Sequence, residues 1–167
     1  MPVRPIVRYP DPVLKTPAEE IAPGPEADAL ARDLVDTMRA SPACVGLAAP
    51  QIGVAKRAFC LDVSEHKRAR STHGLIVMLN PVIIGRKGRT VMREGCMSLP
   101  DFTATVARAE EVMVVGIDPE ERPMMLEADG FEARAFQHEI DHVNGLLFLD
   151  RVSSLSADVF PRKRYAG

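Results

Sequence analysis

The stretch Gln137–His142, which reads Gln-His-Glu-Ile-Asp-His, decides how the rest of the chain is interpreted. Residues four apart lie on one face of an α-helix, with their β-carbons about 5–6 Å apart. His138 and His142 can therefore direct two imidazole nitrogens at one divalent metal, about 2.0–2.1 Å from it. Glu139 is rotated about 100° from the first histidine, so it lies near water at the metal and is not an easy third ligand. Two imidazoles, a carboxylate base and a metal together indicate a hydrolytic site.

The residues around this stretch predict the helix that carries it. Asp129 and Glu132 have the spacing of a capping box at a helix N-terminus, and Asn144-Gly145 is typical of a helix end. Apolar residues between them supply one buried face: Phe131, Ala135, Phe136, Ile140 and Val143. Histidine pairs also occur at this spacing on helix surfaces, but a pair in the middle of a buried helix is best explained by a metal.

Composition limits the classes of protein that this chain can belong to. Its 167 residues are 46% hydrophobic and 26% charged, which is typical of a soluble globular protein. We expect a single domain over residues 1–167. The net charge of −2 gives no strong field for nucleic acid or an acidic membrane. The chain has no apolar run long enough for a membrane span, no apolar signal region and only three cysteines, so we predict a cytoplasmic protein.

The remaining pattern predicts an α+β fold with antiparallel sheets packed around the central metal-binding helix. Residues 1–24 are rich in proline and are expected to form an extended arm, with one helical turn near residues 16–19. Residues 26–39 have helical periodicity. His66 and His73 fall in a charged loop at 64–73 and are interpreted as solvated surface residues. Strands are predicted at residues 56–63, 75–79 with 81–84, 90–93, 105–107, 112–117 and 123–126.

Two further segments carry candidate functional residues. The run 45–53 consists of small residues around Gln51, a pattern that usually marks a turn but also lets a backbone approach a ligand closely. Cys96 follows a glycine and could give a metal its thiolate, at about 2.3 Å for zinc. Cys96 could instead be a small buried hydrophobic residue with no metal role. An aspartate or glutamate elsewhere could then complete the ligand set. Three protein ligands with a fourth position for water are typical of a catalytic metal site.

Three segments in this order resemble the three motifs of peptide deformylases: Gly46–Gln51, Glu94–Ser98 and Gln137–His142. The resemblance covers nearly the whole chain. It implies that the metal ligands are Cys96, His138 and His142, and that Glu139 is the general acid/base. It further implies that the Gln51 side-chain amide and the Met97 backbone N–H stabilise the oxyanion.

The resemblance also implies the cofactor and the reaction. The expected metal is ferrous iron in the cell, with zinc, nickel or cobalt able to occupy the site. The expected substrate is the formyl-methionine terminus of nascent polypeptides, and the products are formate and a free amino terminus. The substrate backbone would pair with the chain near Val45 and Gly46, and Val45, Ala135 and Phe136 would form the methionine pocket. Arg108 and Asp141 are expected to pair and hold the helix.

Two departures from the family pattern keep alternatives open. Cys44 replaces the first glycine of the Gly-x-Gly that usually begins the first motif, and Thr103 stands where many members carry an arginine. They motivate an alternative, a deformylase-like hydrolase that acts on another N-acylated peptide or amide. A third reading is a non-catalytic metal-binding domain, which Glu139 argues against because a structural site needs no base. We expect a monomer, and the basic tail 161–165 suggests transient contact with the ribosome.

Overall fold

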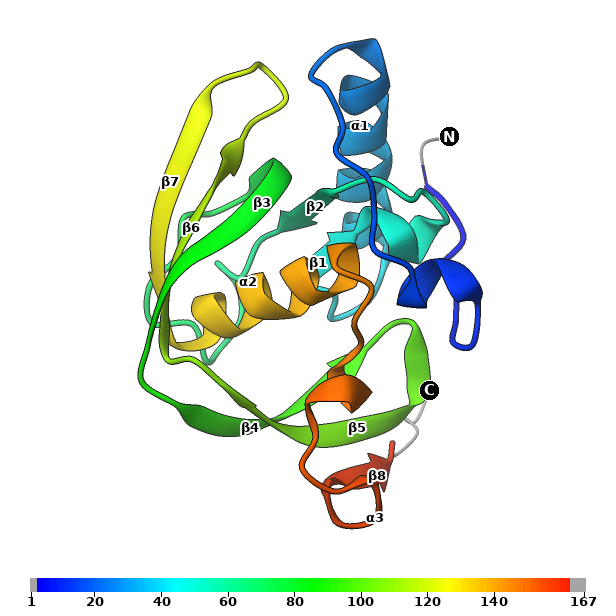
Figure 1. Ribbon diagram of the computed structural model, residues 1–167, viewed down its shortest axis with the longest axis vertical. Coiled ribbons are helices and arrows are strands. Elements are labelled where there is room, and N and C mark those ends of the chain that lie inside the picture. Colours follow the sequence, from blue (N-terminus) through cyan, green and yellow to red (C-terminus); the bar gives the residue numbers. More distant parts are fainter. Residues whose placement is uncertain (1–2, 163–167) are drawn as a thin grey trace.

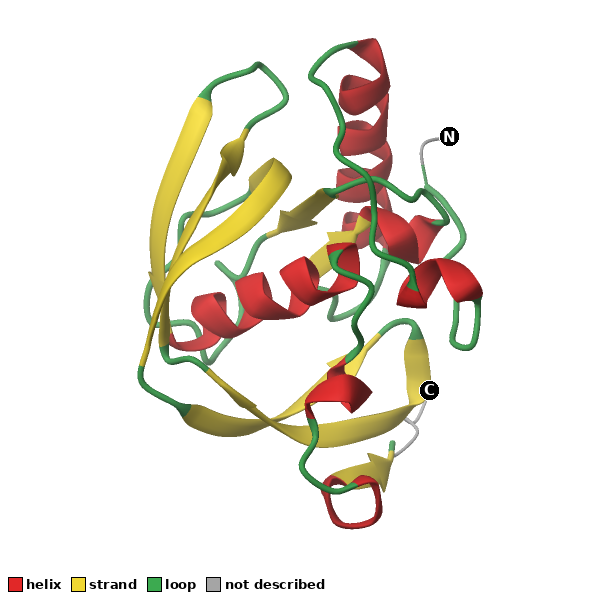
Figure 2. Cartoon of the chain, viewed as in Figure 1, coloured by secondary structure: helices red, strands yellow, loops and turns green. Residues whose placement is uncertain are grey.

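The computed structural model describes residues 3–162 and shows two antiparallel sheets with a helix between them (Figures 1 and 2). The first sheet has five strands in the order β1-β2-β3-β6-β7 and the second has three in the order β4-β5-β8. The strands are β1 (Gly46–Ala48), β2 (Ala58–Leu61), β3 (Ile76–Lys87), β4 (Thr90–Cys96), β5 (Leu99–Arg108), β6 (Glu111–Ile117), β7 (Pro123–Asp129) and β8 (Val159–Pro161). The helices are α1 (Pro25–Ala40), α2 (Gly130–Val143) and the single turn α3 (Leu155–Asp158), with 3₁₀ turns at η1 (Pro12–Lys15), η2 (Ala49–Ile52) and η3 (Phe148–Arg151). The predicted α+β class is confirmed.

Helix α2 lies in the centre of the molecule because it is apolar toward the five-stranded sheet. Phe136 and Ile140 pack into one buried cluster with Phe59 of β2, Met78 of β3 and Val114 of β6. The rings of Phe59 and Phe136 meet edge to face, with centroids 5.9 Å apart, an arrangement that aromatic pairs favour. This packing fixes the helix against the sheet, between it and β4 and β5 (Figure 1), and His138 and His142 contact Glu94 and Cys96 of β4.

Helix α1 covers the opposite face of the same sheet near its β1 end. Leu30, Leu34 and Met38 recur at helical spacing and are buried in a second cluster with Leu47 of β1 and Cys60 of β2. Strand β2 is therefore buried on both faces, which explains why its sequence lacks the alternation of polar and apolar residues seen in half-exposed strands. Among the described residues, no helix is both long and apolar enough to cross a membrane.

Helix α2 begins where the sequence predicts, but the predicted capping box is wrong. Gly130, the first residue of α2, has a positive φ of 54°, and Asp129 makes no side-chain cap. Its Oδ1 instead accepts a hydrogen bond of 2.7 Å from the Ser71 hydroxyl. The Glu132 carboxylate accepts from the His73 backbone N–H at 2.7 Å and lies 2.6 Å from its ring Nδ1. Both acidic side chains therefore hold the 64–73 loop.

The interpretation of the loop histidines as solvated surface residues is confirmed for His73, which is exposed, and is wrong for His66, which is half-buried. The His66 ring stacks on Phe131 of α2 with centroids 3.9 Å apart and the planes 8° from parallel. His73 binds Glu132 as described above. The loop is thus attached to the first turns of α2 at three points, and no local sequence pattern indicates these long-range contacts.

Helices 26–39 and 129–143 and the predicted strands are confirmed, with differences at their bounds. Residues 75–84 form part of one long strand, β3. The helical turn expected near residues 16–19 lies instead at Pro12–Lys15, where the Asp11 carboxylate accepts a hydrogen bond from the Val13 N–H at 3.0 Å. The segment 45–53 holds a short strand, β1, as well as a turn, because Gly46, Leu47 and Ala48 pair with β2.

Candidate metal centre and active site

Two elements bring the three expected ligands together. Cys96 ends β4, and His138 and His142 lie one turn apart on α2. The Cys96 Sγ is 3.4 Å from His142 Nε2, and that nitrogen is 3.3 Å from His138 Nε2. A tetrahedral metal with bonds of about 2.0–2.1 Å to nitrogen and about 2.3 Å to sulfur would hold such atoms about 3.4–3.6 Å apart. The spacing fits one metal ion bound by all three residues.

The chemistry of these donors also fits a metal. A thiolate and two imidazoles are the ligand types of zinc and ferrous sites. Cys96 and His142 are almost fully buried, and the His138 side chain is 13% exposed. Lone pairs of a sulfur and two nitrogens that face one another without water repel, and a shared cation removes that repulsion. The Cys96–His138–His142 group is the one cluster of candidate metal ligands found in the described part of the chain.

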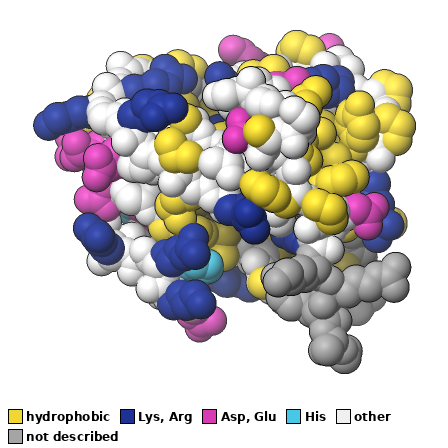
Figure 3. Space-filling view, turned by 90° about the horizontal axis from the view of Figure 1, so that it is seen from below, with side chains coloured by type: hydrophobic (Ala, Val, Ile, Leu, Met, Phe, Trp, Pro, Cys, Tyr) yellow, Lys and Arg dark blue, Asp and Glu magenta, His cyan; other side chains and the backbone are white. Residues whose placement is uncertain are grey.

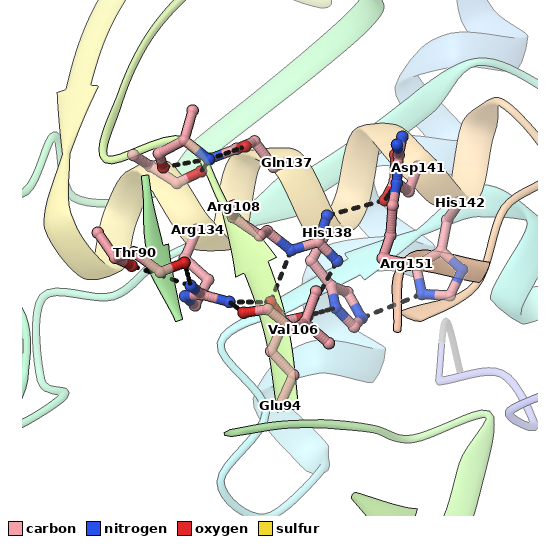
Figure 4. Close-up of polar contacts among 12 residues, drawn as sticks. Thr90, Glu94, Val106, Arg108, Arg134, Gln137, His138, Asp141, His142 and Arg151 are labelled. Atoms are coloured by element: carbon pink, nitrogen blue, oxygen red, sulfur yellow. Dashed lines mark hydrogen bonds and ion pairs between the residues drawn. The ribbon is translucent and has the colours of Figure 1, made fainter. Parts of the chain in front are cut away.

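Glu94 of β4 holds His138 in place (Figure 4). Its Oε1 lies 2.9 Å from His138 Nδ1, and Arg108 donates to the same carboxylate from Nε at 2.6 Å and from Nη2 at 2.9 Å. Arg134 donates from Nη1 to Oε2. Burial by itself would raise the pKa of the Glu94 carboxyl, but hydrogen bonds from His138 and Arg108 hold that pKa well below its ordinary value.

Asp141 continues this network along the same face of α2. Arg108 Nη1 donates to its Oδ2 at 2.8 Å, so the predicted Arg108–Asp141 pair is confirmed. Arg151 of η3 donates to both carboxylate oxygens, at 2.8 Å and 3.1 Å. The sequence analysis missed Glu94, Arg134 and Arg151. Glu94 could have been found because it lies two residues before Cys96 and therefore shares its inward strand face.

Gln51 of η2 reaches the centre from the first sheet. Its Oε1 accepts a hydrogen bond of 3.0 Å from the Ala48 N–H, and this contact fixes the orientation of the amide. The Nε2 group is consequently directed to Cys96 Sγ, at 3.5 Å, and to the Ser98 hydroxyl, at 3.2 Å. An amide donor therefore faces the same space as the three ligand atoms.

Glu139 lies next to this centre with its carboxylate against β1. The side chain is 4% exposed, and its Oε1 has no hydrogen-bond partner among the described residues. A Cβ added at Gly46 would come within 2.7 Å of Oε2, so only glycine leaves room for this carboxylate. Burial raises the pKa of the Glu139 carboxyl to about 7. Such a group can take and return a proton at neutral pH.

A pocket of about 400 Å³ opens from the centre between β1 and β4, each of which is an end strand of its sheet. Most of the predicted site residues line it: Gln51, Met97, Cys44, Val45, Gly46, Ala135, Cys96, His138 and Glu139. Phe131 lines it as well, which the sequence analysis did not propose. Phe136 does not line it, because this side chain is fully buried against the five-stranded sheet. His142 is not among the residues that line the pocket, but its Nε2 atom lies 3.4 Å from the Sγ of Cys96, which does line it.

Residues 3–158 match the family described as polypeptide deformylase. The chain belongs to the peptide deformylase family. A peptide deformylase of Acidobacterium capsulatum is 43% identical over 164 residues, which are 98% of this chain and 94% of that protein. The crystal structure of the Legionella pneumophila deformylase matches with a TM-score of 0.83 and 38% identity, over 92% of this chain and 88% of that one. A structure of the Acinetobacter baumannii deformylase with Met-Ala-Ser bound matches with a TM-score of 0.82 and 31% identity, over 90% and 98%.

Membership of the deformylase family establishes the activity class of the chain. It is an enzyme, a metal-dependent hydrolase that removes the formyl group from formyl-methionyl peptides and releases formate. The described residues also contain a candidate metal site, Cys96 with His138 and His142. The alternative of another N-acylated substrate is not favoured by relatives that share this much of the chain, and a non-catalytic role does not agree with this family.

Proposed function

We propose that Cys96, His138 and His142 hold the metal of this deformylase and that Glu139, Gln51 and Met97 are its catalytic groups. The observation that carries the proposal is the convergence of one sulfur and two imidazole nitrogens, 3.3–3.4 Å apart, beside a buried carboxylate and a fixed amide donor. A divalent ion bound there would act as a Lewis acid that lowers the pKa of water toward neutrality. We propose ferrous iron in the cell, with zinc, nickel and cobalt as other occupants.

Glu139 supports proton transfer in this proposal. Its Oε1 is buried and free of protein partners among the described residues, so it can accept the proton of the attacking water. The same carboxyl can then donate that proton to the leaving amine, as general acid/base catalysis requires. Gly46 has no side chain and therefore leaves room for Oε2 against β1.

Gln51 and Met97 would stabilise the charge that develops on the formyl oxygen. The Gln51 amide is held by Ala48 with its Nε2 facing the centre, so it needs no reorganisation during the reaction. Met97 follows the ligand Cys96 and lines the same pocket, and we propose its backbone N–H as the second donor. Loss of one such donor commonly lowers turnover by about 10²–10³-fold.

The substrate backbone would add to the free edge of β1. Val45 O accepts from the Asp62 N–H toward β2, and backbone direction alternates along a strand, so the Gly46 carbonyl faces the pocket. We propose that Cys44, Val45 and Gly46 bind the peptide and that Val45, Ala135 and Phe131 surround the methionine side chain, with Phe136 supporting Ala135 from the core. The Acinetobacter relative binds Met-Ala-Ser, a peptide that begins with methionine.

The test is hydrolysis of formyl-Met-Ala-Ser by protein purified without oxygen and loaded with ferrous iron. We expect rapid release of formate from this peptide and none from acetyl-Met-Ala-Ser. Glu139→Gln should abolish turnover while the protein still binds one equivalent of metal. Turnover that survives in Glu139→Gln would exclude the proposed role of this carboxylate, and loss of metal from that variant would show a structural role instead.

The nascent formyl-methionyl chain is the partner that we propose, and the cytoplasm is the compartment in which the enzyme would meet it. The predicted ribosome contact concerns the basic tail at 161–165, and residues 163–167 lie outside the described residues. It stays a prediction, as does the monomeric state. Sedimentation of the enzyme with ribosomes, with and without residues 163–167, tests the contact.

A further inference from the structure

Apart from Arg134, which pairs with Glu94, four cationic side chains line the pocket that leads to the metal centre: Lys67, Arg68, Arg93 and Arg162. None of them forms an ion pair with a carboxylate among residues 3–162. The acidic groups of the same pocket are already committed, because Glu94 is bound by Arg108 and Arg134 and Glu139 faces the centre. The pocket rim therefore carries unpaired positive charge in a protein whose net charge is −2.

Lys67 and Arg68 lie on a part of the rim that is held in place. They follow His66, whose ring stacks on Phe131 of the pocket wall at 3.9 Å. The Arg68 N–H also donates to His66 Nδ1 at 3.1 Å, and Ser71 and His73 attach the rest of the loop to α2. Both charged side chains are exposed, so they can contact the part of a bound peptide that extends out of the pocket.

Arg162 and Arg93 supply the charge on the β4 side. The Arg162 guanidinium lies against Gly95, where an added Cβ would overlap it, and Gly95 precedes the ligand Cys96. The Arg93 guanidinium lies 4.0 Å from the centroid of the Phe160 ring of β8. Figure 3 views the three-stranded sheet from below, and Lys and Arg side chains are spread over much of that face.

The path of the substrate brings its second to fourth residues to this rim. The formyl group must reach the metal centre, and the pocket opens between the edges of β1 and β4. An extended peptide advances about 3.3 Å per residue, so the residues after methionine lie within about 10 Å of the centre as they leave. A carboxylate at one of these positions would lie between cations on both sides of the pocket. The acidic residues of the pocket would not repel it from there, because Glu94 is paired with arginines and Glu139 faces the metal centre.

We propose that this rim makes the enzyme selective for formyl-methionyl peptides that carry an acidic residue at positions two to four. The inference rests on the proposed function of the pocket and adds a substrate class to it. Because three of the cations are exposed and Arg162 is half-buried, each contact is worth little by itself and is weakened by salt. Rim charges of this kind chiefly affect association, so the preference should appear in KM and kcat/KM more than in kcat.

The experiment compares formyl-Met peptides that differ only by Asp or Asn at position two, three or four. At low salt we expect kcat/KM to be about threefold to tenfold higher for Asp than for Asn at the best position. The ratio should fall to about one at about 0.5 M salt. In Lys67→Gln/Arg68→Gln and in Arg93→Gln the ratio should also fall toward one.

Arg86→Gln/Arg89→Gln is the matched control for the double variant. It removes two positive charges from exposed residues at the end of β3 and in the turn that follows, which do not line this pocket, and it should keep the full preference. Equal loss in the control would assign the effect to net charge and overturn the proposal. Equal rates for Asp and Asn peptides would overturn it too, whereas no hydrolysis of any formyl-Met peptide would contradict the proposed function itself.

Nucleic acid is the competing ligand for a basic rim. Anisotropy of a labelled single-stranded RNA at the same low salt distinguishes the two. RNA binding that depends on Lys67 and Arg68, together with no preference for acidic peptides, would overturn the proposal and assign the rim to RNA.

Discussion

Glu94 Oε1 lies 2.9 Å from Nδ1 of His138. The Glu94 carboxylate is held ionised by Arg108 and Arg134 and can only accept, so Nδ1 carries the proton. The lone pair of His138 is consequently on Nε2, the atom that faces His142 and the metal position. A residue outside the ligand set thus selects the tautomer that binds metal.

Replacing Glu94 with glutamine should weaken metal binding. The shape of the side chain is kept, but the negative charge that fixes His138 and neutralises two buried arginines is removed. We expect metal affinity to fall by about 10–100-fold and stability to fall as well, because Arg108 and Arg134 would lose a buried counter-charge. Competition with a chelator measures the affinity, at a temperature well below unfolding.

Glu127→Gln is the control for this substitution because Glu127 is an exposed residue of β7. It removes the same charge and should leave metal affinity unchanged. A Glu94→Gln protein that binds metal as tightly as wild type would show that the carboxylate does not set the ligand geometry.

Gly46→Ala should lower activity without unfolding the protein. A Cβ at this position would lie 2.7 Å from Glu139 Oε2, so the carboxylate must move from its place against β1. Misplacement of a catalytic group by about 1 Å can cost about 10²-fold in rate, and we expect a loss of at least about tenfold in kcat. Steady-state kinetics and thermal unfolding check the two halves of this prediction.

Gly85→Ala provides a comparison in the same sheet. Its Cβ would meet Met113 Cβ at 3.5 Å, which is ordinary contact. This variant should keep wild-type activity. Similar losses in both variants would trace the effect to sheet stability and not to Glu139.

The sequence predicted those parts of the site that depend on local spacing. His138 and His142 meet because a helix brings residues four apart together, and the bounds of α2 followed from its apolar face and its Asn144-Gly145 end. Cys96 and Gln51 were candidates from their local sequence, but their roles, and the choice of Met97, came from resemblance to a family, since no spacing rule links them to α2.

The contacts that were missed depend on the packing of distant segments. Glu94 meets His138 only because β4 crosses α2, and β1 is a strand only because its three residues pair with β2. The 64–73 loop is charged and looked solvated, yet Asp129 and Glu132 hold it. The local sequence predicted that these two carboxylates cap the N-terminus of α2. In the structure they instead form hydrogen bonds with Ser71 and His73 of the loop.

Glu132→Ala should destabilise the protein and loosen the loop that carries Lys67 and Arg68. The Glu132 side chain is fully buried and accepts from the His73 backbone N–H and lies within hydrogen-bond distance of its ring. The substitution leaves the His73 backbone N–H without its acceptor. An unpaired donor of this kind lowers the free energy of unfolding by about 1–3 kcal/mol. For a domain of this size we expect Tm to fall by roughly 2–10 °C, and amide exchange should become faster at residues 66–73.

Glu110→Ala is a suitable comparison, because Glu110 is an exposed acidic residue outside the loop contacts. It should change Tm by less than about 2 °C. An unchanged Tm and unchanged exchange in Glu132→Ala would show that the loop is held by its other contacts alone.

Cys44 should be inert toward thiol reagents, although it lines the pocket. Its Sγ lies 3.2 Å from the Gly46 carbonyl oxygen and donates to it. Burial and the nearby Glu139 charge raise the pKa of the Cys44 thiol to about 12. The thiolate is the reactive form, and at pH 8 a thiol with this pKa is ionised about 10³-fold less than an ordinary one.

The higher intrinsic nucleophilicity of a more basic thiolate recovers part of this factor. We therefore expect iodoacetamide to alkylate Cys44 of the metal-loaded enzyme at least about 30-fold more slowly than in the unfolded chain. Intact mass should show almost no adduct on the folded enzyme, whereas protein unfolded in urea should gain adducts at all three cysteines. Peptide mapping assigns any adduct, and rapid modification of Cys44 with parallel loss of activity would show that the thiol opens to solvent and does not stay on the Gly46 carbonyl.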